Sequence, residues 1–308
     1  MTGVPRPPGA VSMRRFVLPV LVAILNIAVG NLYLAHGSEL TKAQKKWVNK
    51  TLAAMTLEEK AAQMIMVAQT GYPRNPRSEA ALDLVEAVRD DEVGGLILMR
   101  SEEATIPGLL NSLQNEARVP LLVAMDMERS LSFRLVRGST DLPFAMAVGA
   151  TGSEDAARFL GEVTAREGRA LGIHWAFAPV VDVNNNPDNP VINIRSFGED
   201  PEMVGRLGAA FIEGAHSGGL MTSAKHFPGH GDTAVDSHKD LPVIDGDRRR
   251  LETVEWPPFR MAIAAGVDSV MVGHIAVPAL DETGRPATLS KALCAVILRG
   301  EMGFDGLI

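Results

Sequence analysis

The chain has 308 residues, of which 46% are apolar and 22% charged, so it has enough apolar material for a large globular core. Its formal net charge of -7 argues against nucleic acid as a partner, because surfaces that bind nucleic acid are strongly basic. The single cysteine, Cys294, excludes an intramolecular disulfide and a cysteine-based zinc site, and we expect it to be a small core residue.

The N-terminal segment has the pattern of an export signal. Arg14-Arg15 precede a mostly apolar run over residues 16–35, and Ala28-Val29-Gly30 offers a small-x-small cleavage site. The run also approaches the ~20 residues that cross a bilayer. We therefore predict that residues 1–36 are a signal peptide or a membrane anchor, and that residues 37–308 form an exported domain, either periplasmic or extracellular.

Beyond residue 50, short apolar runs alternate with helical patterns. The predicted strands are Gln63–Val67, Gly95–Met99, Leu121–Met125, Trp175–Val180, Thr222–His226 and Ser269–Gly273. The predicted helices include Ser78–Asp90, Ser153–Leu171, Glu202–Ser217 and Trp256–Ala265. Repeated β-α-β units of this kind imply a parallel sheet.

At this length, an α/β fold of the (β/α)₈ (TIM) barrel type fits best. A seventh strand begins at Gly306, so we expect the barrel to be incomplete at its C-terminal end, within strand 7. The alternative is a doubly wound open sheet. That fold would favour a G-x-G-x-x-G turn after a strand, which the sequence lacks.

The segment Lys225–Thr233, with the sequence K-H-F-P-G-H-G-D-T, concentrates ionisable side chains and is followed by Asp236-Ser237-His238. A helix would not tolerate Pro-Gly-His-Gly at its centre, so a strand end running into a loop is predicted. Charged groups just past the C-terminal end of a parallel strand are where α/β barrels keep their active sites.

This segment resembles glycoside hydrolase family 3, and most closely its NagZ-like β-N-acetylglucosaminidases. Members of that branch carry K-H-F-P-G-H-G-[DE]-T followed by D-S-H. Further similar segments are Trp47–Met64, Ala178–Val183, Arg195–Pro201 and Val270–His274, so the resemblance covers about residues 40–308.

The resemblance implies a retaining hydrolase that releases terminal β-N-acetylglucosamine, with Asp236 and His238 as the acid/base pair. An unperturbed imidazole titrates near ~6.5, which suits it to donate and accept a proton at neutral pH. The nucleophilic Asp of the family would lie just past Ile308, so the chain as given is expected to be inactive. Asp305 precedes its strand, at the end opposite the site, and is expected to cap or turn the chain.

The resemblance also implies a set of sugar-binding residues: Asp126, Arg134, Arg195, Lys225 and His226. Lys225 ends a buried strand, where a charge is costly unless it faces a polar cavity or an ion-pair partner, with Asp182 as one candidate. The family pattern D-x-E-G-G-R-V-x-R reads here as D-M-E-R-S-L-S-F-R over residues 126–134. The loss of Gly-Gly alters the permitted backbone and leaves the sugar preference open.

The partner implied is a carbohydrate, such as a peptidoglycan or chitin fragment, with no cofactor and no metal. A zinc site built from His226, His230, His238 and His274 is the competing interpretation, but H-x₃-H falls on a Pro-Gly loop rather than on one helix face. Two alternatives to the predicted function stay open. One is a β-glucosidase-type member of the family, and the other is a non-catalytic sugar-binding or remnant protein.

Overall fold

The computed structural model describes residues 40–71, 75, 77–236 and 240–308. The predicted signal or anchor at residues 1–36 therefore lies outside the described residues. Within them, no helix is both long and apolar enough to cross a membrane.

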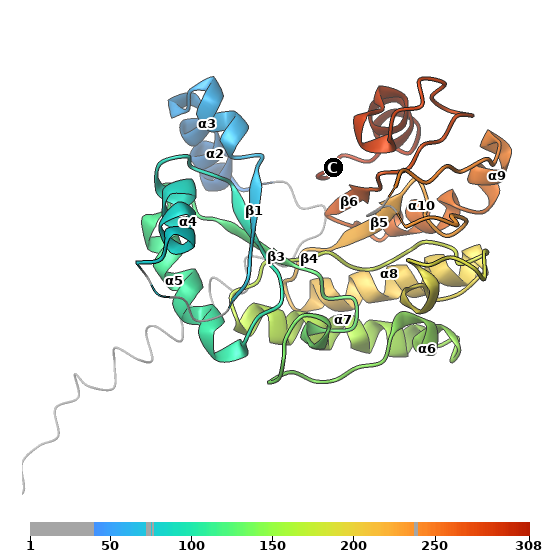
Figure 1. The fold of residues 1–308 in the computed structure, drawn as a ribbon, viewed down its shortest axis with the longest axis horizontal. Helices are drawn as coiled ribbons and strands as arrows, with labels where there is room; N and C mark the ends of the chain where they lie inside the picture. The colour runs from blue at the N-terminus through green and yellow to red at the C-terminus, as the bar shows by residue number, and fades with distance from the viewer. Residues whose placement is uncertain (1–39, 72–74, 76, 237–239) are drawn as a thin grey trace, which may run out of the picture. The chain divides into compact units, whose positions relative to one another are not determined.

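Parallel strands alternate with helices along the chain, as the sequence predicts (Figure 1). The strands are β1 Met66–Gln69, β2 Gly95–Leu98, β3 Leu122–Met125, β4 Trp175–Ala176, β5 Ser223–Phe227 and β6 Ser269–Val272. The α-helices are α2 Lys42–Ala54, α3 Leu57–Ala62, α4 Glu79–Arg89, α5 Ile106–Glu116, α6 Ala145–Gly149, α7 Glu154–Ala170, α8 Pro201–Ser217, α9 Arg248–Thr253 and α10 Trp256–Ala264. Short 3₁₀ turns cover Glu103–Thr105 (η2), Leu131–Phe133 (η3), Asn193–Arg195 (η4) and Ala287–Leu289 (η5), and η6, Ala292–Glu301, is a π-helix.

The strands follow one another in chain order, and every pairing between them is parallel. β1 to β4 form one sheet, and β5 pairs with β6 in a second. Single parallel bridges continue this order from Trp175 to Met221, from Val180 to Lys225 and from Ser269 to Leu307. This succession of parallel strands and helices is the α/β arrangement that was predicted. No bridge among the described residues joins Leu307 back to β1, so the closed barrel stays a prediction.

Helices α7 and α8 pack closely against each other because glycines face the neighbouring backbone. A Cβ on Gly161 of α7 would overlap the carbonyl oxygen of Phe211, and one on Gly214 of α8 would overlap that of Arg158. Asp200 is the N-cap of α8, because its side chain accepts a hydrogen bond of 2.7 Å from the backbone N–H of Met203. This tight pair lies along β4 and β5 and supports the strands whose ends carry polar residues (Figure 1).

The core lies between these helices and the strands. The inward residues of β2 and β3, including Leu96, Leu98, Val123 and Met125, are fully buried. Aliphatic residues buried on both faces of a strand are typical of parallel sheets covered by helices.

Candidate active site

Polar residues lie near or just past the C-terminal ends of three consecutive strands. Asp126 comes directly after β3, Asp182 lies six residues after β4, and Lys225 and His226 lie within β5. Because the strands are parallel, these ends meet at one edge of the sheet. The peptide bond between Lys225 and His226 is cis, and the pairing of β5 with β6 shifts by one residue at this point.

Lys225 is the centre of an ion-pair network of five residues. Its Nζ lies 2.9 Å from Oδ1 of Asp126 and 2.7 Å from Oε1 of Glu128. Glu128 also accepts two hydrogen bonds of 2.8 Å from Nε and Nη2 of Arg195, in the bidentate geometry that an arginine fork favours. Arg134 pairs with the other oxygen of Asp126. We call this set, Arg134–Asp126–Lys225–Glu128–Arg195, the Lys225 network.

The network is charged and largely buried. Burial favours the neutral form of Glu128, but the charge of Lys225 and the hydrogen bonds from Arg195 hold its pKa well below the usual range. For Asp126, burial acts in the same direction and is likewise outweighed, by Lys225 and Arg134, so its pKa is also lowered. Three cations (Lys225, Arg134, Arg195) thus face two carboxylates (Asp126, Glu128), which leaves one positive charge in surplus.

His226 is held by a separate acid, Asp182, rather than by the Lys225 network. Its Nδ1 lies 2.7 Å from Oδ2 of Asp182, and its backbone N–H also donates to that carboxylate. Burial lowers the pKa of His226 against the opposing charge of Asp182. We therefore assign a neutral ring with its proton on Nδ1, which leaves Nε2 as an acceptor.

Asp182 also fixes the first part of the loop after β5. Its Oδ1 accepts from the backbone N–H of His230 at 2.6 Å. The side-chain amide of Asn189 donates to the carbonyl oxygens of His230 at 2.8 Å and Gly231 at 3.0 Å. The backbone of His230 thus takes part in fixing the course of this loop. We call His230–Thr233 the loop root.

Asp232 belongs to the same root and pairs with Arg250 of α9 at 2.9 Å. Farther along the loop, Asp236 is half-buried. His238 lies outside the described residues, so the predicted Asp236–His238 acid/base pair stays a prediction. Arg250 also donates to Glu255, 3.3 Å away and almost fully buried at the start of α10.

The structure brings four of the predicted sugar-binding residues into one network: Arg134 and Lys225 contact Asp126 directly, and Arg195 is joined to Lys225 through Glu128. The suggested pairing of Lys225 with Asp182 is wrong, because Lys225 reaches Asp126 and Glu128 while Asp182 holds His226. Glu128 was not among the predicted site residues. Its spacing of two residues from Asp126 was a usable signal, since alternate residues of an extended chain point to the same side.

The departure from the family's Gly-Gly has a visible backbone consequence. Ser130 stands at the second glycine position with φ 64° and ψ -164°, a region that glycine adopts far more readily than serine. Its hydroxyl donates to the carbonyl oxygen of Thr140 at 2.8 Å, which compensates part of that cost. Arg129, at the first glycine position, pairs with Asp141 at 3.0 Å and stacks on Phe144, so it does not join the Lys225 network.

Within the described part of the chain, no group of three or more His, Cys, Asp or Glu side chains is arranged to hold a metal ion. The rings of His226 and His230 meet edge to face, with centroids 5.8 Å apart. Their Nδ1 atoms contact Asp182 and Thr233 respectively. In both rings Nδ1 is thus engaged in a hydrogen bond within the protein.

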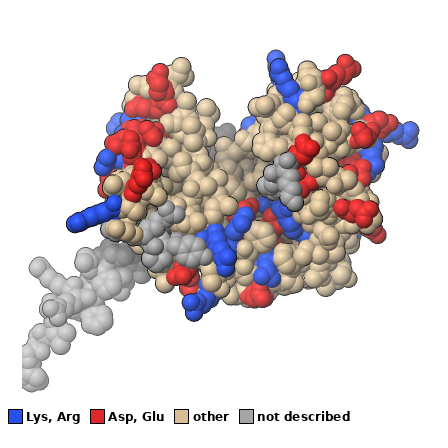
Figure 2. All heavy atoms as spheres, viewed as in Figure 1, with Lys and Arg blue, Asp and Glu red and all other residues tan. Residues whose placement is uncertain are grey.

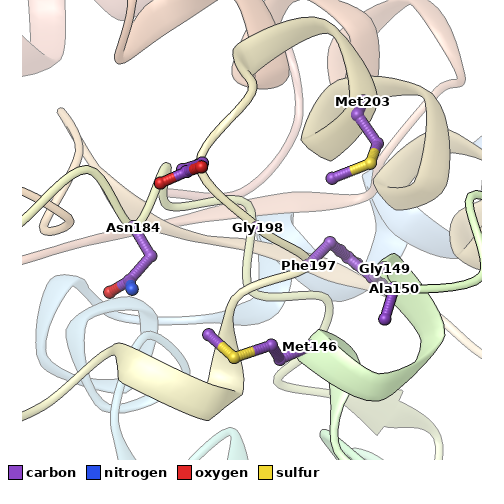
Figure 3. Close-up of a pocket in the computed structure, with 8 residues that line it drawn as sticks. Met146, Gly149, Ala150, Asn184, Phe197, Gly198 and Met203 are labelled. Atoms are coloured by element: carbon purple, nitrogen blue, oxygen red, sulfur yellow. The ribbon is translucent and has the colours of Figure 1, made fainter. Parts of the chain in front are cut away.

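Basic and acidic side chains lie side by side near the middle of the face shown in Figure 2. A pocket of about 330 Å³ lies on the flank of the Phe197–Glu199 segment, away from the Lys225 network. Figure 3 shows Met146 from α6 and Met203 from α8 beside it, with Asn184 at the opposite wall. It contains no member of the Lys225 network, so we do not place the site there.

Residues 56–308 match the family description "Glycosyl hydrolase family 3 N terminal domain". The chain belongs to glycoside hydrolase family 3. The resemblance noted from Lys225–Thr233 is thereby confirmed, and the family 3 domain spans most of the described residues.

Three relatives illustrate the similarity. A β-N-acetylglucosaminidase/β-glucosidase of Cellulomonas fimi is 37% identical over 276 residues, which cover 85% of this chain and 47% of the relative. The structure of a family 3 β-N-acetylglucosaminidase from Paenibacillus sp. strain FPU-7 has a TM-score of 0.77 and 41% identity, covering 82% of this chain and 49% of that one. A β-glucoside phosphorylase, BglX, bound to 2FGlc has a TM-score of 0.81 and 30% identity, covering 89% and 50%. The chain thus spans about half the length of each of these three proteins.

Proposed function

We propose that this family 3 domain belongs to a retaining O-glycosyl hydrolase that releases terminal β-N-acetylglucosamine residues. The observation that carries the proposal is the Lys225 network, a cluster of charged donors and acceptors at the strand ends that is built to bind oxygen-rich molecules. The names of the relatives from Cellulomonas fimi and Paenibacillus support the choice of sugar.

Each member of the site has a chemical reason to bind sugar hydroxyls. Asp126 is held as a carboxylate and accepts hydroxyl protons, while Lys225 and Arg195 donate to hydroxyl oxygens. The neutral ring of His226 adds an acceptor at Nε2. Glu128 and Asp182 act as positioning residues, because each fixes the side chains that would contact the sugar.

The chemical step would use Asp236 and His238 as acid and base. The acid protonates the leaving oxygen, and the resulting base then activates the water that releases the sugar. The covalent intermediate requires a second carboxylate, which we place, following the family pattern, after Ile308.

Export of the domain, through the signal or anchor predicted at residues 1–36, is part of the same proposal.

A β-glucoside-processing enzyme is the second candidate. It is favoured by the relative named as both β-N-acetylglucosaminidase and β-glucosidase, and by the likeness to a β-glucoside phosphorylase. The two candidates differ in whether the 2-acetamido group is required for binding.

Binding of N-acetylglucosamine and of glucose to the whole chain, measured by ligand-observed NMR, separates them. We expect N-acetylglucosamine to bind the more tightly, and Asp126→Asn to weaken it about tenfold or more, as loss of a charged acceptor costs about 1.5–3 kcal/mol. Asp141→Asn, at an exposed acid outside the network, is the matched control and should leave binding unchanged. Equal binding of both sugars would favour the β-glucoside candidate, and binding of neither would refute the proposal.

A further inference from the structure

Arg250 on α9 contacts both ends of the loop that leads from β5 to this helix. Its Nη2 lies 2.9 Å from Oδ2 of Asp232 in the loop root. Its aliphatic stem packs on Gly246 at the far end of the loop, where an added Cβ would lie only 2.9 Å from Cδ of Arg250. Asp236 belongs to the chain segment between these two contacts. One side chain therefore spans the base of the loop that bears Asp236.

Glu255 lies beside Arg250 and is only 1% exposed. Its Oε1 accepts from Nε of Arg250 at 3.3 Å. It also packs against Gly229, the residue directly before the loop root, where an added Cβ would lie 2.7 Å from both Cβ and Cγ of Glu255. Glu255 therefore contacts both the side chain that spans the loop and the backbone that leads into it.

The burial of this carboxyl group is costly. Its Oε2 is buried and makes no well-formed hydrogen bond with the described residues, and burial raises the pKa of Glu255 against the opposing charge of Arg250. An apolar side chain of similar volume would avoid both costs. What the acid supplies, and an apolar residue could not, is a negative charge that orients the guanidinium of Arg250. That guanidinium in turn holds Asp232.

The contact through Arg250 differs from those that Asp182 and Asn189 make with the loop root. These two residues bind backbone atoms of the root, and they precede the loop in the chain. Arg250 binds a side chain of the root and follows the loop in the chain. Because a displacement of about 1 Å near the reacting groups can lower a rate ~100-fold, this second attachment matters for the placement of Asp236.

We propose that Arg250 and Glu255 are positioning residues for the acid/base step: Arg250 fixes the base of the loop that bears Asp236, and Glu255 orients Arg250. This inference rests on the proposed function, in which Asp236 is one member of the acid/base pair. The ion pairs of Arg250 run to Asp232 and Glu255 rather than to the Lys225 network. The two residues would therefore serve the chemical step and not the binding of the sugar.

The order of the loop can be measured with a nitroxide spin label at residue 235 of the whole chain. Val235 is 42% exposed and follows the loop root by two residues, so Val235→Cys accepts the label, and Cys294→Ser removes the other thiol. We expect Arg250→Gln and Glu255→Gln each to lower the ratio of immobilised to mobile label about threefold, the effect of losing one partly buried charge pair. Arg250→Lys keeps the charge and should retain most of the order.

Arg248→Gln and Glu252→Gln are the matched controls. These two residues form an exposed pair of 2.8 Å on the same helix, and the further ion pair of Arg248 runs to Glu301, so the ratio should not change. In the double variant Arg250→Gln/Glu255→Gln the ratio should equal that of Arg250→Gln alone, because Glu255 acts through Arg250.

A ratio unchanged in both Arg250→Gln and Glu255→Gln, or additive losses in the double variant, would overturn the inference while leaving the proposed function intact. Loss of N-acetylglucosamine binding in parallel with the loss of loop order would also overturn it, because the two residues would then support the whole site rather than the loop. Failure of the unmodified chain to bind the sugar would refute the proposed function, and the inference with it.

Discussion

His174 makes the stability of the domain depend on pH in a way that can be isolated. Its Nδ1 accepts a hydrogen bond from the backbone N–H of Val123 at 3.1 Å, and this atom can accept only while it carries no proton. Burial, with a contribution from the charge of Arg169, lowers the pKa of His174 to about 4. The ring joins β3 to the residue before β4, so its protonation would disturb the sheet.

The sign follows from comparing the folded and unfolded chains. Above pH 6.5 the ring is neutral in both, so it adds no pH dependence. Below pH 6.5 the ring binds a proton in the unfolded chain but not in the folded chain. The free energy of unfolding therefore decreases as the pH is lowered from 6.5 to the folded pKa of about 4. A fully shielded ring would lose about 3 kcal/mol over this interval, and because His174 is only partly buried we expect about 1–2 kcal/mol.

Urea unfolding of the unmodified chain and of His174→Asn at several pH values between 7.5 and 4.5 measures the pH-dependent loss of stability that is due to His174. Asparagine can place an oxygen where Nδ1 lies but does not titrate, so contributions from all other groups cancel in the difference. We expect the unmodified chain to lose about 1–2 kcal/mol more than the variant as the pH falls. If the two proteins lose stability in parallel, the reasoning about His174 is wrong.

Two further predictions concern stability and use the same unfolding measurement. Glu128→Gln should lower the free energy of unfolding by about 3 kcal/mol, because it removes one partner from a buried ion-pair network. Glu213→Gln removes one partner of an exposed pair and should change the free energy of unfolding little. Similar small losses in both variants would show that the network is not stabilising. Gly231→Ala should lower the free energy of unfolding by more than about 2 kcal/mol, since the added Cβ would overlap the carbonyl oxygen of Val183. The control Gly108→Ala in α5 places its Cβ in open space and should raise the free energy of unfolding by about 0.5–1 kcal/mol. Equal effects of the two variants would contradict the close packing of the loop root.

Hydrophobic patterning located the strands well because each is a buried run with turn residues on either side. The first strand was misplaced, since α3 continues to Ala62 and β1 begins only at Met66, three residues later than predicted. Of the predicted strand Trp175–Val180, only Trp175 and Ala176 form a regular β-strand. Pro179 has no N–H to donate, so regular pairing stops before it, although Val181 still donates to the carbonyl oxygen of Lys225 at 2.9 Å.

The site was harder to predict than the fold because its partners are far apart in sequence. Lys225 and Asp126 are separated by 99 positions, and nothing local indicates which acid the lysine meets. Motif matching selected Asp126, Arg134, Arg195, Lys225 and His226 as sugar-binding residues, and it passed over Glu128 although the D-x-E spacing was available. Only the three-dimensional arrangement shows that this one carboxylate holds both Lys225 and Arg195.

The attachment of the loop root has a consequence for how the loop after β5 can vary in length. Three acceptors of the root are held by a single amide, Asn189, and a fourth contact ties the N–H of His230 to Asp182. An insertion before Thr233 would pull these donors and acceptors out of register all at once. An insertion after Thr233 would leave every one of them in place. The length of the loop after Thr233 can therefore change without disturbing the hydrogen bonds of the loop root.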